Sequence, residues 1–160
     1  MSFIINQKNI KVMKAKLIIS DFTQEDLADF FSTALYGNGA WSADYDAKDY
    51  KERCDVNEND CYEDKLAKCL LAGCSIEVGD RYSEGEDDVY GDNERVYWDK
   101  ENEVMTYPIT LKDIKRGLEK AYECGQSERV NYLVNDPGQM DMIDADVLLQ
   151  IIVYGEVIYG

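Results

Sequence analysis

Short apolar runs separated by polar turns predict a mixture of strands and helices along the chain. Apolar residues alternate with lysines and then run together over residues 9–20, which is typical of a strand. Residues 40–46 and 74–80 are also predicted to form short strands. Residues 95–109 are predicted to form one or two further strands, with a turn near Lys100.

Four segments combine helical spacing of apolar residues with a capping residue at the start and a glycine at the end. An acidic residue three positions after the cap completes the N-terminal signal in each. The predicted caps are Thr23, Asp60, Thr110 and Asp141, and the closing glycines are Gly37 with Gly39, Gly73, Gly125 and Gly155. In the first helix, Phe22 and Leu27 occupy the positions of a hydrophobic staple.

The fourth predicted helix, after Asp141, is the most apolar segment of the chain and is expected to lie in the core, with Leu148 and Ile152 buried. Residues 47–60 lack a helical or strand period and are predicted to form a polar loop. Residues 84–94 are predicted to form a hairpin tip or loop.

The length of 160 residues suits one domain with a substantial core, and no repeat, low-complexity tract or linker divides it. The sequence predicts a single α+β domain over residues 1–160, with about four helices packed on a small, mainly antiparallel sheet. No window approaches the run of about 18 apolar residues that a membrane span needs. We therefore expect a cytoplasmic protein that binds no membrane.

The net charge of the chain limits the kinds of molecule that it can bind. The chain has 17 basic and 33 acidic residues, a net charge of −16, and residues 37–110 alone hold 20 acidic against 8 basic residues. Such a protein repels nucleic acids and attracts basic surfaces. We expect no direct nucleic-acid binding and a basic protein partner.

The stretch EGEDDVYGDNE, residues 84–94, has six carboxylates in eleven residues and no basic residue. Concentrated like charge costs stability, so such a face is often kept for a partner, and tyrosine supplies interface area at low entropic cost. A solvated loop is the alternative. The expected partner-binding residues are Asp44, Asp46, Asp49, Glu84, Glu86, Asp87, Asp88, Tyr90, Asp92 and Glu94.

Catalytic, cofactor and metal signatures are missing from the sequence. Without histidine, Ser/His and Cys/His nucleophile pairs are excluded, and no glycine-rich phosphate loop or nucleophile elbow occurs. We therefore expect neither an enzyme nor a bound cofactor. The five cysteines form no Cys-x-x-Cys pair, so reduced thiols are expected rather than a zinc site.

One segment imitates a calcium loop. Asp55, Asn57 and Asn59 match the first, third and fifth positions of an EF-hand. The sixth position is Asp60 instead of glycine, and the twelfth is Leu66 instead of glutamate. We therefore expect no metal there.

Three stretches, CYEDKLAKCLLAGCSIEVGD, YPITLKDIKRGLEKA and DMIDADVLLQIIVYGEVIYG, carry a recurring pattern. Its marks are an Asp-rich turn, an Ala-Asp pair, an apolar helix containing Gln and a Tyr-Gly-rich end, matched by Asp144, Ala145, Asp146, Gln150 and residues 154–160. Over roughly residues 60–160 the chain resembles small uncharacterised proteins of bacteriophages and other mobile elements.

Small acidic phage proteins often act against host defence, as anti-CRISPR or antirestriction proteins that imitate the phosphate charge of DNA. The resemblance and the charge together imply a phage-encoded inhibitor. Its partner would be a basic nucleic-acid-binding protein or a CRISPR effector complex of the host. Two alternatives remain open: a phage structural or assembly protein that self-associates, for example as a homodimer, and a carboxylate metal-binding protein, including a metal-dependent enzyme.

Overall fold

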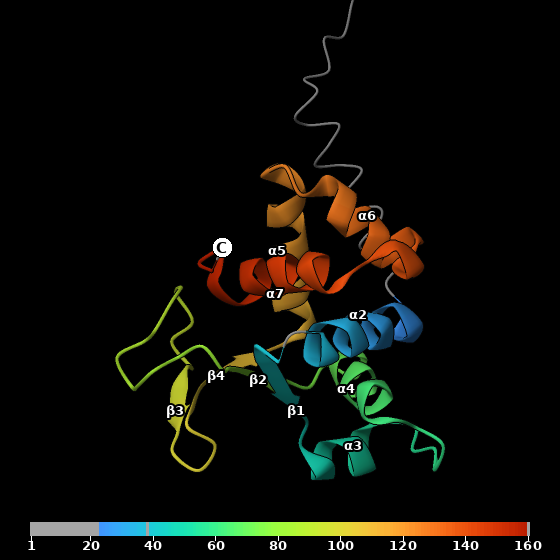
Figure 1. The fold of residues 1–160 in the computed structure, drawn as a ribbon. Helices are drawn as coiled ribbons and strands as arrows, with labels where there is room; N and C mark the ends of the chain where they lie inside the picture. Colours follow the sequence, from blue (N-terminus) through green and yellow to red (C-terminus); the bar gives the residue numbers. More distant parts are fainter. Residues whose placement is uncertain (1–22, 38, 160) are drawn as a thin grey trace, which may run out of the picture.

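In the residues that the structure describes, four strands form one antiparallel sheet in the order β1-β2-β4-β3 (Figure 1). The computed structural model describes residues 23–37 and 39–159. The strands are β1 Trp41–Asp44, β2 Ile76–Asp80, β3 Tyr97–Asp99 and β4 Val104–Ile109. In the register, Trp41 lies opposite Asp80, and Val78 lies opposite Tyr107.

Six α-helices accompany the sheet in the described residues, which confirms the predicted α+β class of a single domain. They are α2 Gln24–Tyr36, α3 Ala47–Arg53, α4 Tyr62–Leu71, α5 Leu111–Glu123, α6 Ser127–Asn135 and α7 Met142–Tyr154. A short 3₁₀ turn, Pro137–Gln139, joins the last two. None of the described helices has the length and apolar character needed to cross a bilayer.

The predicted capping boxes at Thr23, Thr110 and Asp141 are confirmed, each with an aspartate at the third helical position. The cap predicted at Asp60 is wrong by one residue. The carboxylate of Asp64 accepts the N–H of Cys61, so Cys61 is the cap of α4.

The predicted polar loop over residues 47–60 is wrong in its first half, which forms α3. Asp46 caps this helix by accepting the N–H groups of Lys48 and Asp49. The side chain of Tyr50 is buried and anchors it. A seven-residue helix with one buried anchor is too short to show an apolar period in the sequence.

Helix α6 was not predicted from the sequence either. It buries Val130 and Leu133, three positions apart, but its N-cap residue, Gln126, makes no capping hydrogen bond with its side chain. The apolar signal was present, and the start signal was not.

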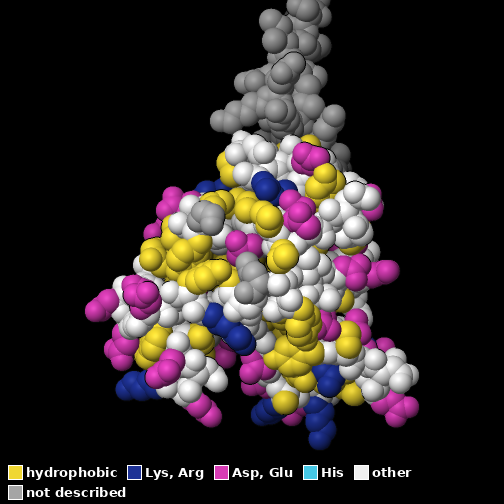
Figure 2. Space-filling model, viewed as in Figure 1, with side chains coloured by type: hydrophobic (Ala, Val, Ile, Leu, Met, Phe, Trp, Pro, Cys, Tyr) yellow, Lys and Arg dark blue, Asp and Glu magenta, His cyan; other side chains and the backbone are white. Residues whose placement is uncertain are grey.

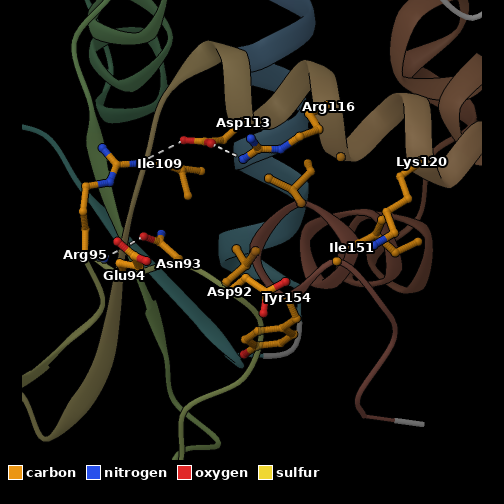
Figure 3. A pocket seen from close by; sticks show the side chains of 14 residues that line it. Asp92, Asn93, Glu94, Arg95, Ile109, Asp113, Arg116, Lys120, Ile151 and Tyr154 are labelled. Atoms are coloured by element: carbon orange, nitrogen blue, oxygen red, sulfur yellow. Dashed lines mark hydrogen bonds and ion pairs between the residues drawn. The ribbon is translucent and has the colours of Figure 1, made fainter.

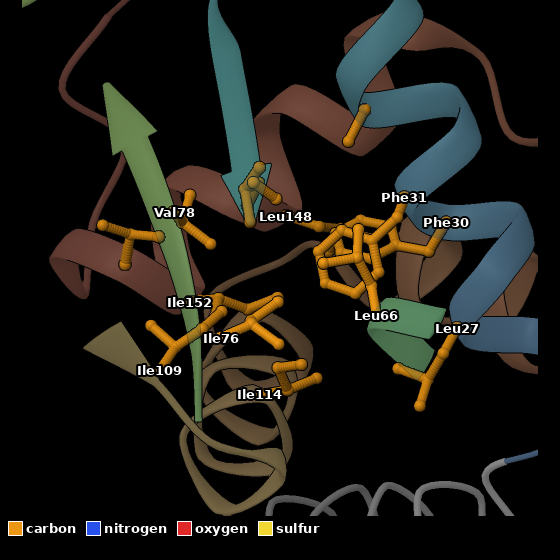
Figure 4. Packing of buried hydrophobic residues seen from close by; sticks show 14 of the residues in the cluster. Leu27, Phe30, Phe31, Leu66, Ile76, Val78, Ile109, Ile114, Leu148 and Ile152 are labelled. Atoms are coloured by element: carbon orange, nitrogen blue, oxygen red, sulfur yellow. The ribbon is translucent and has the colours of Figure 1, made fainter. Parts of the chain in front are cut away.

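The core lies between the sheet and the helices, where side chains of α2, α4, α5 and α7 meet Ile76, Val78 and Ile109 of the strands (Figure 4). Leu148 and Ile152 of α7 are buried, as predicted. Gly117 of α5 permits the close approach of the two helices, because a Cβ there would lie 2.5 Å from the Cα of Ile152. The predicted strand over residues 9–20 and the staple residue Phe22 lie outside the described residues.

Candidate functional site

Residues 84–94, here called the acidic loop, lie between β2 and β3 and project from the sheet side of the molecule (Figures 1 and 2). Five of the six carboxylates are on exposed residues: Glu84, Glu86, Asp87, Asp92 and Glu94. Asp88 is half-buried and accepts the N–H of Glu84 at 2.5 Å.

The carboxylates of the acidic loop form no ion pair with a described lysine or arginine. Within residues 23–37 and 39–159, the ion pairs are Lys68–Asp60, Arg95–Asp113, Arg116–Asp113 and Arg129–Asp144. None of them includes a residue of the loop. As far as the structure describes the chain, the loop therefore presents a concentrated negative charge without ion-pair partners.

Tyr90 anchors the loop instead of pointing freely into solvent. Its ring is half-buried, with centroids 5.5 Å from Tyr154 and 5.9 Å from Tyr159, and its N–H donates to the Tyr107 hydroxyl at 3.2 Å. Gly91 then passes close to α7: its φ is 77°, and a Cβ there would lie 2.9 Å from the carbonyl oxygen of Tyr154. These contacts hold the middle of the loop against the end of α7.

The two tyrosines that Tyr90 packs against, Tyr154 and Tyr159, are held in place by a buried carboxylate. Asp80, at the end of β2, is fully buried and accepts the Tyr154 hydroxyl at 2.5 Å, the Tyr159 hydroxyl at 2.9 Å and the Tyr82 N–H at 2.8 Å. Burial, followed by the hydrogen bond to Asp80, raises the pKa of both tyrosines far above the usual value. Both hydroxyls therefore stay protonated as donors at neutral pH.

A second polar network fixes the C-terminal segment that supplies Tyr159. The Gln150 side-chain oxygen accepts the N–H groups of Ile158 and Tyr159, both at 2.8 Å. The Gln150 amide donates to Asp146 at 2.9 Å, and the other oxygen of Asp146 accepts the indole N–H of Trp41 at 2.7 Å. In this structure, Asp146, Gln150 and Tyr159 make internal contacts that support the base of the loop.

A hollow of about 660 Å³ adjoins the end of the acidic loop (Figure 3). Asp92 and Glu94 line one side of it, and Arg95 and Arg116 both pair with Asp113. Burial alone would raise the pKa of Asp113, but hydrogen bonds from Thr110 and the two arginines lower it overall. Asp113 pairs with both arginines, and Lys120 also lines the hollow. The three acidic residues of the lining are therefore matched in number by three basic ones.

Asp44, Asp46 and Asp49 lie in a different place. Asp44 is opposite Glu77, at the other end of β2 from Asp80, where the chain leaves for the acidic loop (Figure 1). Asp44 accepts the Tyr62 hydroxyl at 2.8 Å, and Asp46 serves as the cap of α3. The structure does not bring these three aspartates together with residues 84–94.

The segment that imitates a calcium loop binds the ammonium group of a lysine that follows it in the chain. The ammonium of Lys68 donates to the Asp55 carbonyl and to the Asp60 carboxylate, each at 2.7 Å. Asp60 also accepts the Tyr50 hydroxyl at 2.5 Å. In the part of the chain that the structure describes, no group of three or more His, Cys, Asp or Glu residues could hold a metal ion.

The buried cluster around Asp80 was not predicted from the sequence. The signal available in the sequence was a set of polar residues in otherwise apolar surroundings: Asp80 closing a strand, and Asp146 and Gln150 within the most apolar helix. Comparison of the chain with protein-family models, curated proteins and solved structures found no match.

Proposed function

We propose that this protein is a phage-encoded inhibitor of a host defence nucleoprotein, of the anti-CRISPR or antirestriction kind. It binds a basic nucleic-acid-binding protein, or a CRISPR effector complex, through the acidic loop and competes there with DNA. One observation carries the proposal: five exposed carboxylates with no ion-pair partner among the described residues stand on a loop anchored by Tyr90.

The contacts of Tyr90 that hold the acidic loop in place should also strengthen binding to the partner. A loop that is already held in place loses less conformational entropy on binding than a free one does. Its charges attract a basic groove from a distance and raise the association rate, and dissolved salt weakens that attraction.

The resemblance to mobile-element proteins supports the choice of target class, and the charge supports the kind of surface that is bound. Binding of this type needs no catalytic residue in the inhibitor. The proposal therefore assigns the loop a recognition role.

Capture from a host lysate that contains active CRISPR and restriction systems tests this function. The tagged protein is incubated with the lysate, and bound proteins are eluted with duplex DNA and identified by mass spectrometry. We expect the eluted proteins to be nucleic-acid-binding components of a defence system. If duplex DNA releases no specifically bound protein, the proposed competition with DNA is wrong.

Self-association is a second candidate, favoured by an apolar surface hollow of about 450 Å³ between the end of α2 and the start of α7. Tyr36, Met142 and Ile143 line it and are 68%, 49% and 61% exposed. A protein that assembles through this surface would show a concentration-dependent mass in sedimentation velocity, with little response to salt. Ile143→Lys would then abolish the change in mass.

A further inference from the structure

Three cysteines gather where α3 meets α4. Cys54 ends α3 and is half-buried, whereas Cys69 in α4 and Cys74 just before β2 are buried. The thiol of Cys54 donates to the sulfur of Cys69 at 3.9 Å. The two exposed cysteines have other partners: Cys61 donates to Asp64 and Cys124 to the Ala121 carbonyl.

We propose that Cys54 and Cys69 are a site of reversible oxidation, at which hydrogen peroxide converts the two thiols to a disulfide. The sulfurs are already in contact, so a disulfide of about 2.05 Å requires a shift of roughly 2 Å between them. Hydrogen peroxide can reach the half-buried Cys54, whereas Cys69 is buried. The inference does not depend on the proposed function.

The reaction proceeds in two steps. The Cys54 thiolate attacks one oxygen of hydrogen peroxide, the O–O bond breaks, and hydroxide leaves with the thiol proton as water, giving a sulfenic acid. The Cys69 sulfur then attacks the Cys54 sulfur. The S–S bond forms, the S–O bond breaks, and the departing hydroxide takes the proton of Cys69 as a second water. Two electrons pass from the sulfur pair to one peroxide.

The burial of the two cysteines determines which sulfur attacks hydrogen peroxide first. Burial, followed by the neighbouring Cys54, raises the pKa of Cys69 to about 12. Cys69 is therefore protonated at neutral pH and is a poor first nucleophile. The half-buried Cys54 meets the oxidant, and Cys69 resolves the sulfenic acid. Because Cys54 ends α3, the disulfide would tie that helix covalently to α4.

Peptide mapping tests the site. Reduced protein is treated with hydrogen peroxide, alkylated without reductant and digested with trypsin and a glutamate-specific protease. Cleavage after Glu58 separates Cys54 from Cys61, and fragmentation of the peptide over residues 69–77 distinguishes Cys69 from Cys74.

We expect a peptide linking Cys54 to Cys69 that dithiothreitol removes. Cys124→Ser, the matched control, should yield the same linked peptide, and Cys54→Ser should yield none. The inference is overturned if peroxide oxidises Cys124 while no Cys54–Cys69 peptide forms, or if the recovered peptide joins Cys69 to Cys74 instead.

Discussion

Replacing Tyr154 by phenylalanine removes one hydroxyl from the buried cluster that supports the acidic loop. The hydroxyl donates to Asp80 at 2.5 Å, and both residues are buried. The phenylalanine ring retains the contacts with Trp41 and Tyr107, whose centroids lie 5.7 and 5.4 Å away. The substitution therefore deletes a hydrogen bond without opening a cavity.

The expected loss is about 1.5–3 kcal/mol in the free energy of unfolding, the range for hydrogen bonds to a charged group. Asp80 keeps the Tyr159 hydroxyl and the Tyr82 N–H, so the carboxylate is not left without donors. Since Tyr90 packs on the ring that remains, the acidic loop should stay in place.

Urea unfolding followed by circular dichroism measures this loss. Tyr132→Phe is the matched control, because the Tyr132 hydroxyl donates to Glu128 on an exposed helix face. The control should change the unfolding free energy by less than about 0.5 kcal/mol. If Tyr154→Phe falls within the same range, Asp80 does not depend on this donor and the account of the cluster is wrong.

The Tyr154 hydroxyl should also make the free energy of unfolding depend on pH. The pKa of Tyr154 is raised in the folded protein, and an unfolded tyrosine has a pKa of about 10. Above pH 10 the unfolded chain therefore loses a proton that the folded protein keeps, so stability falls as pH rises. This residue contributes up to about 1.4 kcal/mol per pH unit to that fall. Tyr154→Phe should flatten the slope, and parallel slopes for the two proteins would contradict the assignment.

Three further predictions follow from other parts of the structure. Leu148→Ala should cost about 2–5 kcal/mol in urea unfolding, because the side chain is fully buried; a loss below about 0.5 kcal/mol would contradict its place in the core. Millimolar calcium or magnesium should leave the melting temperature unchanged, whereas a saturable rise would reveal a cation site. Gly91→Ala should loosen the acidic loop, since a Cβ would meet the Tyr154 carbonyl; faster cleavage by a glutamate-specific protease should report this, and an unchanged rate would count against the loop contact.

Local signals predicted much of the fold. Capping boxes at Thr23, Thr110 and Asp141 depend on residues three positions apart, so each helix start could be predicted from a short window. The apolar character of α7 indicated its place in the core. The strands between residues 41 and 109 were predicted for the same reason, since alternation is a short-range pattern.

What could not be predicted depends on contacts between distant segments. Asp80 and Tyr154 are 74 positions apart, and Trp41 and Asp146 are 105 apart, so no local pattern links either pair. Tyr90 was predicted to bind a partner, and this stays a prediction. Its half-buried position against α7 depends on the same long-range packing. The separation of Asp44 from the acidic loop likewise follows from the sheet register.

The most direct test of the central claim compares two variants that carry the same net charge. The loop variant combines Glu86→Gln, Asp87→Asn, Asp92→Asn and Glu94→Gln, and leaves Asp88 intact because it accepts the Glu84 N–H. The matched control combines Glu25→Gln, Glu52→Gln, Glu58→Gln and Glu123→Gln, four exposed residues elsewhere on the molecule. Both variants should unfold at the same urea concentration as the wild type.

The measurement is the amount of DNA-displaceable, nucleic-acid-binding protein that each variant captures from the host lysate, at low and at high salt. The account predicts that the control captures as much as the wild type at low salt, that the loop variant captures far less, and that high salt removes the difference. Equal capture by the loop variant and the control would show that residues 84–94 are only a solvated loop.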